Sequence, residues 1–190
     1  MKKIFLMLGG NIGDRLFYLS QCAELLSNNV GQIVAMSSIY ESEPWGFNDP
    51  QWFLNQVVAV ETNISPNVLL EKTKEIEKQL GRVSTRRGGA CPRPLACPRP
   101  YEEYQARTMD IDILLYGEIV MNTPELVIPH PRMNERMFVL KPMAEIAPDL
   151  IHPVLNRSME YLAKNCTDLK QIKLFDEYMV TDPCCSVKKS

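Results

Sequence analysis

The sequence predicts an α+β fold with a ferredoxin-like βαββαβ core, an antiparallel sheet on which helices pack. Runs rich in β-branched and other apolar residues occur at residues 3–8, 30–40, 53–62 and 107–116. Amphipathic helical patterns separate the first run from the second and the third from the fourth. The resulting order of strand, helix, strand, strand, helix and strand is the split βαβ arrangement of this fold class.

Composition limits the class of protein. The 190 residues are 45% hydrophobic and 8% aromatic, which is sufficient for one domain with a substantial core. We expect residues 1–180 to form that domain and residues 181–190 to form a flexible tail. A formal net charge of -2 argues against nucleic-acid binding, and the absence of any run of about 18 apolar residues argues against a membrane span.

The six cysteines lie in unlike sequence settings and show no paired Cys-x-x-Cys spacing. We therefore expect mostly reduced thiols and a cytoplasmic location. Whether Cys91 and Cys97 form a redox pair is left open by their spacing. We also expect a monomer whose partners are small molecules.

The first strand ends at Gly9-Gly10-Asn11-Ile12-Gly13, a turn that leads into a helix. A glycine-rich turn at this position could hold a phosphate group. It lacks the Lys-Ser/Thr pair of a Walker loop, so we favour a tight turn capped by Asn11 or Asp14.

A loop rich in proline, glycine and aromatic residues, 41–52, precedes the strand 53–62. On that strand Phe53 and Asn55 share a face, which places a ring beside an amide next to the loop. Such a pair suits a flat heterocycle with an amide-like edge. The alternative is that Phe53 packs in the core and Asn55 satisfies a backbone group of the loop.

The next helix begins at Ser65-Pro66, an N-cap followed by a first-turn proline, and ends at Gly81. Residues 81–106 then form a long loop in which Cys-Pro-Arg-Pro occurs twice. From Arg82 to Arg107 there are six arginines and two acids. We expect a lid for a polyanion, because long loops inside compact domains are usually functional or disordered. For the repeat itself we favour a disordered insertion.

The strand 107–116 carries two carboxylates in an apolar run. In an extended chain Asp110 and Asp112 share one side, about 7 Å apart, while their apolar neighbours share the other. We expect this strand in the interior of the sheet, with both carboxylates near the point where Arg82 leaves the helix. Like charges at this distance favour a cation between them, such as a pair of magnesium ions. The alternative is a solvated strand end.

After this strand the chain is extended and rich in proline, and it delivers His130. We expect a helix over 133–140 that ends near Pro142. A short helix at 158–165 and an edge strand at 171–175 complete the predicted elements.

Together these groups indicate a reaction class. Two acids can hold metal ions, several arginines can hold phosphate oxygens, and an aromatic-amide pocket can hold a flat ring. Metal ions and arginines neutralise the charge that develops on a transferring phosphoryl group. The sequence therefore predicts transfer of a phosphorus group from a nucleotide to a heterocycle.

An ordered set of motifs extends over residues 3–155. The set is Gly10-Asn11, Tyr40, Glu43-Pro-Trp-Gly46, Phe53-Leu-Asn55, Ile76-Glu77, Gly81-Arg82, Arg107-Thr-Met-Asp-Ile-Asp-Ile-Leu-Leu-Tyr-Gly117, Pro129-His130 and Arg136-Met-Phe138. In order and spacing these motifs resemble the 6-hydroxymethyl-7,8-dihydropterin pyrophosphokinases of the folate pathway.

The resemblance implies that MgATP gives its β,γ-pyrophosphoryl unit to the pterin hydroxymethyl oxygen and leaves as AMP. By the same resemblance Asp110 and Asp112 hold two Mg²⁺ ions and, with Arg82 and Arg107, form the catalytic set. The residues implied in ATP binding are Lys74, Glu77, Arg107, Ile113 through its backbone, His130 and Arg136. The residues implied in pterin binding are Ser42, Glu43, Pro44, Trp45, Gly46, Phe53, Asn55 and Phe138.

The chain departs from the pattern of the family in the loop before the Asp strand. Members usually carry a short Arg-Trp-Gly-Pro-Arg loop whose tryptophan closes over the substrates, whereas this loop is longer and lacks the tryptophan. Candidates for its arginine and its aromatic residue are Arg86, Arg87, Arg93, Arg99, Tyr101 and Tyr104. An alternative function is therefore a non-catalytic or impaired pterin- or nucleotide-binding homologue. A metal-dependent glycosyl- or nucleotidyltransferase is disfavoured, because nothing resembles a sugar-nucleotide Rossmann half.

Overall fold

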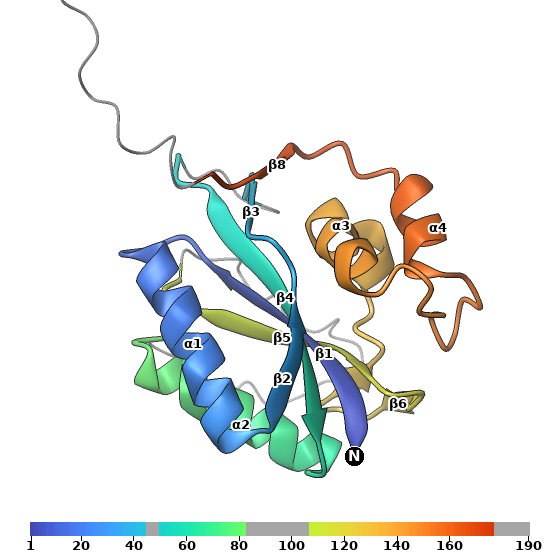
Figure 1. Ribbon diagram of the computed structural model, residues 1–190, viewed down its shortest axis with the longest axis horizontal. Coiled ribbons are helices and arrows are strands. Elements are labelled where there is room, and N and C mark those ends of the chain that lie inside the picture. The colour runs from blue at the N-terminus through green and yellow to red at the C-terminus, as the bar shows by residue number, and fades with distance from the viewer. Residues whose placement is uncertain (45–49, 83–106, 177–190) are drawn as a thin grey trace, which may run out of the picture.

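A computed structural model describes residues 1–44, 50–82 and 107–176 of the chain (Figure 1). These residues form a six-stranded antiparallel sheet in the order β5-β1-β4-β3-β8, with β2 paired to β4. The elements are β1 (Lys2–Gly10), α1 (Arg15–Asn29), β2 (Gln32–Met36), β3 (Tyr40–Ser42), β4 (Phe53–Thr62), α2 (Pro66–Gln79), β5 (Asp110–Tyr116), β6 (Met121–Asn122), β7 (Val127–Ile128), the 3₁₀ helix η1 (Met133–Glu135), α3 (Met137–Ile146), α4 (Met159–Lys164) and β8 (Ile172–Leu174). The α+β fold with a βαββαβ core is confirmed.

The two faces of the sheet carry separate cores. Helices α1 and α2 cover one face, and α3 and α4 cover the other (Figure 1). The first core buries Leu26 and Ile76, and the second buries Met143 and Met159. Strand β1 contributes side chains to both cores, and this explains the unbroken apolar run that begins at Ile4.

Strand β5 lies at one edge of the six-stranded sheet, so the expected interior position is wrong. β1 occupies the interior place instead, because its side chains are apolar on both faces while β5 begins with carboxylates. On the outer side of β5 the amide of His130 donates to the carbonyl of Leu114 (2.9 Å). The chain that follows β7 therefore covers this edge.

The predicted strand 30–40 is divided into β2 and β3. The division falls at Ser37, whose amide donates to the carbonyl of Val57 at 2.9 Å. The Ser37 hydroxyl accepts from the amide of Val57 at 3.0 Å, so a side chain replaces the next main-chain partner.

The predicted helix 133–140 is also divided. The 3₁₀ helix η1 ends before Arg136, whose backbone is extended (φ -121°, ψ 112°), and α3 then continues through Pro142 to Ile146. A proline inside a helix costs about 3 kcal/mol. Burial of three apolar side chains of α3, each worth about 1.5–3 kcal/mol, offsets this cost. Those side chains are Val139, Leu140 and Met143.

Other predicted boundaries are confirmed. The strand 53–62 is β4, and Ser65 caps α2 by accepting from the amide of Val68 at 3.4 Å. The predicted short helix at 158–165 is α4, and the predicted edge strand at 171–175 is β8, which pairs with β3. The predicted tail, 181–190, and most of the predicted lid, 83–106, lie outside the described residues.

No helix among residues 1–44, 50–82 and 107–176 has the length and apolar character needed to cross a membrane.

Candidate active site

Asp110 and Asp112 lie at the start of β5 on the sheet face that α3 covers. Asp112 is the register partner of Met7, which packs in the α3 core, while Ile111 and Ile113 are buried in the opposite core with α1 and α2. The predicted alternation of charged and apolar faces is therefore confirmed. It lets a strand rooted in the core present two carboxylates on one side.

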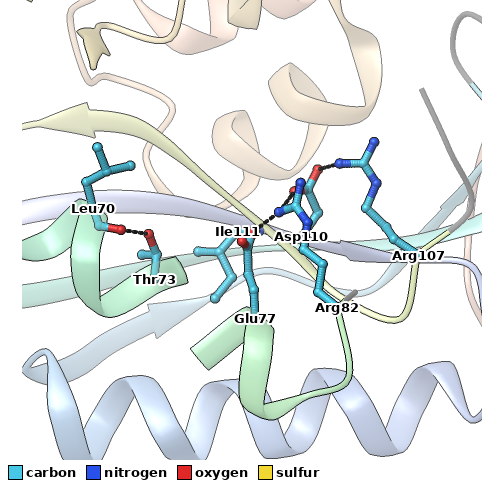
Figure 2. A network of polar contacts seen from close by, with 7 residues as sticks. All are labelled: Leu70, Thr73, Glu77, Arg82, Arg107, Asp110 and Ile111. Atoms are coloured by element: carbon cyan, nitrogen blue, oxygen red, sulfur yellow. Dashed lines mark hydrogen bonds and ion pairs between the residues drawn. The ribbon is translucent and has the colours of Figure 1, made fainter. Parts of the chain in front are cut away.

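Two arginines bind the two oxygens of the Asp110 carboxylate. Arg82 Nη1 lies 2.7 Å from Asp110 Oδ1, and Arg107 Nη1 lies 2.7 Å from Asp110 Oδ2 (Figure 2). Arg82 follows the end of α2 and Arg107 precedes β5, so segments 25 residues apart in the sequence meet at this carboxylate. The predicted proximity of Arg82 and the Asp pair is confirmed.

Glu77, in the last turn of α2, is a third carboxylate of this cluster. Its side chain is buried, accepts from the amide of Ile111 at 2.8 Å and pairs with Arg82 (Figure 2). Burial, together with the nearby charge of Asp110, raises the pKa of Glu77 to about 7. Arg82 thus neutralises two acids from different elements at once.

Burial and the charge of Asp110 together also raise the pKa of Asp112 to about 7. Arg136 and Arg107 oppose this rise. Such a carboxylate ionises more readily when a cation binds beside it, so the Asp pair fits Mg²⁺. Within the described parts of the chain no group of three His, Cys, Asp or Glu side chains could hold a metal ion. A site of two carboxylates suits Mg²⁺ completed by substrate phosphates.

The raised pKa of Asp112 predicts a stability effect in the metal-free protein. Below about pH 4 this carboxyl is protonated in the folded and the unfolded chain alike. Between about pH 4 and pH 7 the unfolded chain loses the proton while the folded chain keeps it, so the contribution of this group to stability falls. Asp112→Asn removes this loss, and its Tm advantage over the parent should grow across this window and then level off. Thermal unfolding in EDTA at several pH values measures it; an advantage independent of pH would contradict the buried charge.

His130 and Arg136 approach from the segments that follow β7. The Nδ1 of His130 accepts from the amide of Arg132 at 3.2 Å, so a neutral ring carries its proton on Nε2. Burial, together with the nearby charge of Arg136, lowers the pKa of His130 to about 4. Arg136 is buried, and its guanidinium carbon lies 5.6 Å from the centre of the Phe138 ring. His130 is therefore neutral at pH 7 and can donate a hydrogen bond from Nε2.

The predicted pterin residues occur on β3, on β4 and at the start of α3. Asn55 Nδ2 donates to Ser42 Oγ at 2.8 Å, and both side chains are buried. Ser42 is the register partner of Phe53, whose side chain is half-buried. Asn55 thus contacts β3, as well as the Phe53 carbonyl at 3.4 Å.

The remaining predicted residues are placed as follows. Pro44 is buried and Glu43 is half-buried after β3, whereas Trp45 and Gly46 lie outside the described residues. Lys74 is exposed on α2, one turn before Glu77.

Asn11 is a further residue of the site, with a role that was not predicted from the sequence. The side-chain Oδ1 of Asn11 accepts a hydrogen bond from the main-chain amide of Arg107 at 2.9 Å. The main-chain amide of Asn11 donates to the Arg107 carbonyl at 3.0 Å. A Cβ at Gly10 would lie 2.3 Å from the carbonyl oxygen of Thr108, so glycine permits this close approach. The cap of α1 is Asp14, which accepts from Phe17, and of the two candidates Asn11 is excluded. The Gly10-Asn11 motif was the available signal.

Asn11→Ala is expected to lower kcat about tenfold or more, because Arg107 loses the side chain that fixes its backbone beside Asp110. The loss of this partly buried hydrogen bond should also reduce the free energy of unfolding by about 1–3 kcal/mol. Steady-state kinetics and thermal unfolding measure the two effects. Asn29→Ala, which removes an exposed bond to the Leu25 carbonyl, is the matched control. Unchanged kcat in the Asn11 variant would show that Arg107 is held by other contacts.

Comparisons with known proteins identify the family of this chain. Residues 5–148 match the family described as 7,8-dihydro-6-hydroxymethylpterin-pyrophosphokinase (HPPK). The 2-amino-4-hydroxy-6-hydroxymethyldihydropteridine pyrophosphokinase of Porphyromonas gingivalis is 41% identical over 154 residues, which are 80% of this chain and 95% of the relative. The Bacillus subtilis protein of the same name is 43% identical over 143 residues, 75% of this chain and 76% of the relative.

A solved structure supports the fold. The chain matches the HPPK-DHPS of Plasmodium falciparum with a TM-score of 0.66 at 15% identity, over 86% of this chain and 44% of that one. The chain thus spans less than half of that longer protein, and the likeness shows the fold alone. The match over residues 5–148 and the identities above 40% show more: this chain belongs to the 7,8-dihydro-6-hydroxymethylpterin-pyrophosphokinase family.

Proposed function

We propose that this chain transfers pyrophosphate from MgATP to the hydroxymethyl group of 6-hydroxymethyl-7,8-dihydropterin, releasing AMP, in folate biosynthesis. The observation that carries the proposal is the arrangement of Asp110 and Asp112 on one face of β5, with Arg82 and Arg107 on the Asp110 carboxylate. Family membership supplies the two substrates. The same arrangement disfavours an inert homologue, because both carboxylates and both arginines are present.

Asp110 and Asp112 are proposed to hold two Mg²⁺ ions. Bound Mg²⁺ would supply Lewis-acid neutralisation of the charge that develops on the phosphate oxygens. The raised pKa of Asp112 supports this assignment, since a nearby cation favours the ionised carboxylate.

Arg82 and Arg107 are proposed to exchange partners when MgATP binds. Both guanidinium groups lie on Asp110 in the structure. Phosphate oxygens are equally suitable acceptors for the planar donor groups of arginine. We therefore infer that both guanidinium groups leave Asp110 and pair with the phosphates of ATP. Asp110 is then available as a metal ligand, and the arginines stabilise the transferring group.

We propose that His130 and Arg136 contact the phosphates of the nucleotide. Neutral His130 can donate its Nε2–H to a phosphate oxygen, and Arg136 can pair with a second. We propose that Lys74 and Glu77 serve the nucleotide end and that the backbone at Ile113 contacts adenine.

For the pterin, we propose that Phe138 stacks on the ring and that Asn55 reads its amide-like edge. The bond from Asn55 to Ser42 fixes the amide orientation and supports this role. Phe53 would line the pocket. The backbone from Ser42 onward would complete it through Glu43, Pro44, Trp45 and Gly46.

We further propose that the protein acts as a monomeric single domain in the cytoplasm and binds no nucleic acid. Within the described part of the chain Cys22 and Cys166 are unpaired thiols, which supports a reducing compartment. The net charge of -2 disfavours a polyanionic macromolecule as partner.

The test is incubation with MgATP and 6-hydroxymethyl-7,8-dihydropterin, followed by identification of the nucleotide product. AMP formation that depends on the pterin supports the proposal. ADP would indicate an ordinary kinase and would overturn it. Pterin binding without turnover would favour the impaired homologue with a degenerate loop.

A further inference from the structure

Residues 168–174, which we name the C-terminal strap, lie beyond the region 5–148 that matches the family. After α4 the chain crosses past α3 and reaches β3, where it adds strand β8 (Figure 1). The pairing is antiparallel, with Ser42 opposite Ile172 and Tyr40 opposite Leu174. The strap therefore adds an edge strand next to the strand that carries Ser42.

One end of the strap is fixed to the start of α3. The Oδ2 of Asp168 accepts from the amide of Met137 at 3.0 Å, and its Oδ1 accepts from the amide of Lys170 at 3.0 Å. Met137 is the first residue of α3, and its neighbours in the chain are Arg136 and Phe138. A carboxylate at this position satisfies an unpaired helix amide and complements the helix dipole. Asp168 thus holds the first turn of α3 from a distance of 31 residues in the sequence.

The other end is fixed to the chain that leaves β3. The amide of Glu43 donates to the carbonyl of Gln171 at 3.2 Å. The ammonium group of Lys170 lies 3.6 Å from a carboxylate oxygen of Glu43. This anchoring point directly follows Ser42, whose hydroxyl accepts from Asn55.

The two anchoring points belong to opposite walls of the proposed pterin pocket. Phe138 is on the α3 wall, and Ser42 and Asn55 are on the sheet wall. The C-terminal end of α3 is held to β3, the strand of Ser42, by Glu145, which accepts a hydrogen bond from the Tyr40 hydroxyl at 3.0 Å. The near end, where Phe138 lies, is held by Asp168 of the strap.

We propose that Asp168 is a positioning residue for the pterin substrate, which sets the separation between the Phe138 wall and the Ser42–Asn55 wall. This inference rests on the proposed function, because it assumes that the pterin lies between these walls. Stacking requires a ring to be held within a narrow range of distances. A loosened α3 start should therefore weaken pterin binding, while the bonds of Asp110 with Arg82 and Arg107 stay unchanged.

The test compares the Asp168→Ala variant of the full chain with the parent. KM is measured for each substrate, and the Kd of 6-hydroxymethylpterin is measured by titration in the presence of a non-hydrolysable ATP analogue. We expect the pterin KM and Kd to rise about tenfold, the effect of losing one charged hydrogen bond, and the ATP KM to change less than twofold. Asp168→Asn keeps an acceptor for the Met137 amide and should restore most of the pterin affinity. Asp149→Ala, an exposed aspartate after α3, should change neither constant.

Lys170→Ala provides a second variant if Asp168→Ala fails to fold. It removes the ion pair with Glu43 and should raise the pterin Kd about twofold to threefold. If Asp168→Ala changes the KM values for pterin and ATP equally, the strap has only a structural role and the inference is overturned. The same holds if the variant has a lower Tm but unchanged KM values. An active parent with an unaffected Asp168→Ala variant would overturn the inference and leave the proposed function intact. A parent that binds no pterin would overturn both.

Discussion

Replacing Asp112 by asparagine is expected to reduce turnover at least about a thousandfold while the protein remains folded. The variant keeps the shape of the side chain and removes the negative charge that we assign to metal binding. Charge neutralisation at a transferring phosphoryl group is worth several kcal/mol, and about 4 kcal/mol corresponds to a thousandfold change in rate. AMP release from MgATP and the pterin measures the effect. The same variant should be no less stable than the parent, since burial raises the pKa of Asp112.

The opposite directions of these two effects separate catalysis from folding. A general loss of structure would lower Tm and turnover together, whereas loss of a metal ligand lowers turnover alone. Asp110→Asn should also abolish turnover, but it removes the charge partner of Arg82 and Arg107. Asp149→Asn, which changes an exposed carboxylate, is the matched control for both. Near-normal turnover in the Asp112 variant would contradict the metal assignment.

The local elements of the fold could be predicted because their signals are local. The cap at Ser65, the proline at its first turn and the strand 53–62 all depend on residues within a few positions of each other. The alternation around Asp110 and Asp112 has the same origin. Strand order was harder to predict, because the edge position of β5 depends on which strand is apolar on both faces.

The parts that were missed depend on contacts between distant segments. Asn11 acts on Arg107 across 96 positions, and Asp168 acts on the start of α3 across 31. The break at Arg136 is similar in kind, since α3 begins where its buried face meets the sheet. The Gly10-Asn11 motif marks Asn11 but does not identify Arg107 as its partner, and no periodicity or short motif marks Asp168. The candidate residues themselves were found through motifs, but the groups that hold them were not.

The site also shows how three arginines share the charge of three acids. Arg82 lies on Asp110 and Glu77, Arg107 lies on Asp110, and Arg136 acts on Asp112 through its charge. Each arginine comes from a different segment: the end of α2, the chain before β5 and the start of α3. Binding of a polyphosphate would therefore bring these three segments onto one ligand.

Arg82→Ala is expected to lower turnover by about a hundredfold to a thousandfold. An arginine that neutralises charge on a transferring phosphoryl group contributes effects of this size. The variant should also lose about 1–3 kcal/mol of stability, because buried Glu77 would be left beside Asp110 without its main counter-charge. Kinetics of AMP formation and chemical denaturation measure the two effects. Arg157→Ala, which changes an arginine that lies over the exposed Tyr161 ring, is the matched control.

Comparison with Arg107→Ala decides whether the arginines restrain the metal site before ATP binds. Arg107 pairs with Asp110, whereas Arg82 pairs with both Asp110 and Glu77, so removal of Arg107 should lower turnover similarly with a smaller loss of stability. Both variants release one oxygen of Asp110 from an ion pair. Each should therefore bind Mg²⁺ more tightly than the parent when no nucleotide is present, by calorimetric titration. Weaker Mg²⁺ binding in both variants would show that the arginines do not compete with Mg²⁺ for Asp110. Turnover of the Arg82→Ala variant within tenfold of the parent would remove Arg82 from the catalytic set.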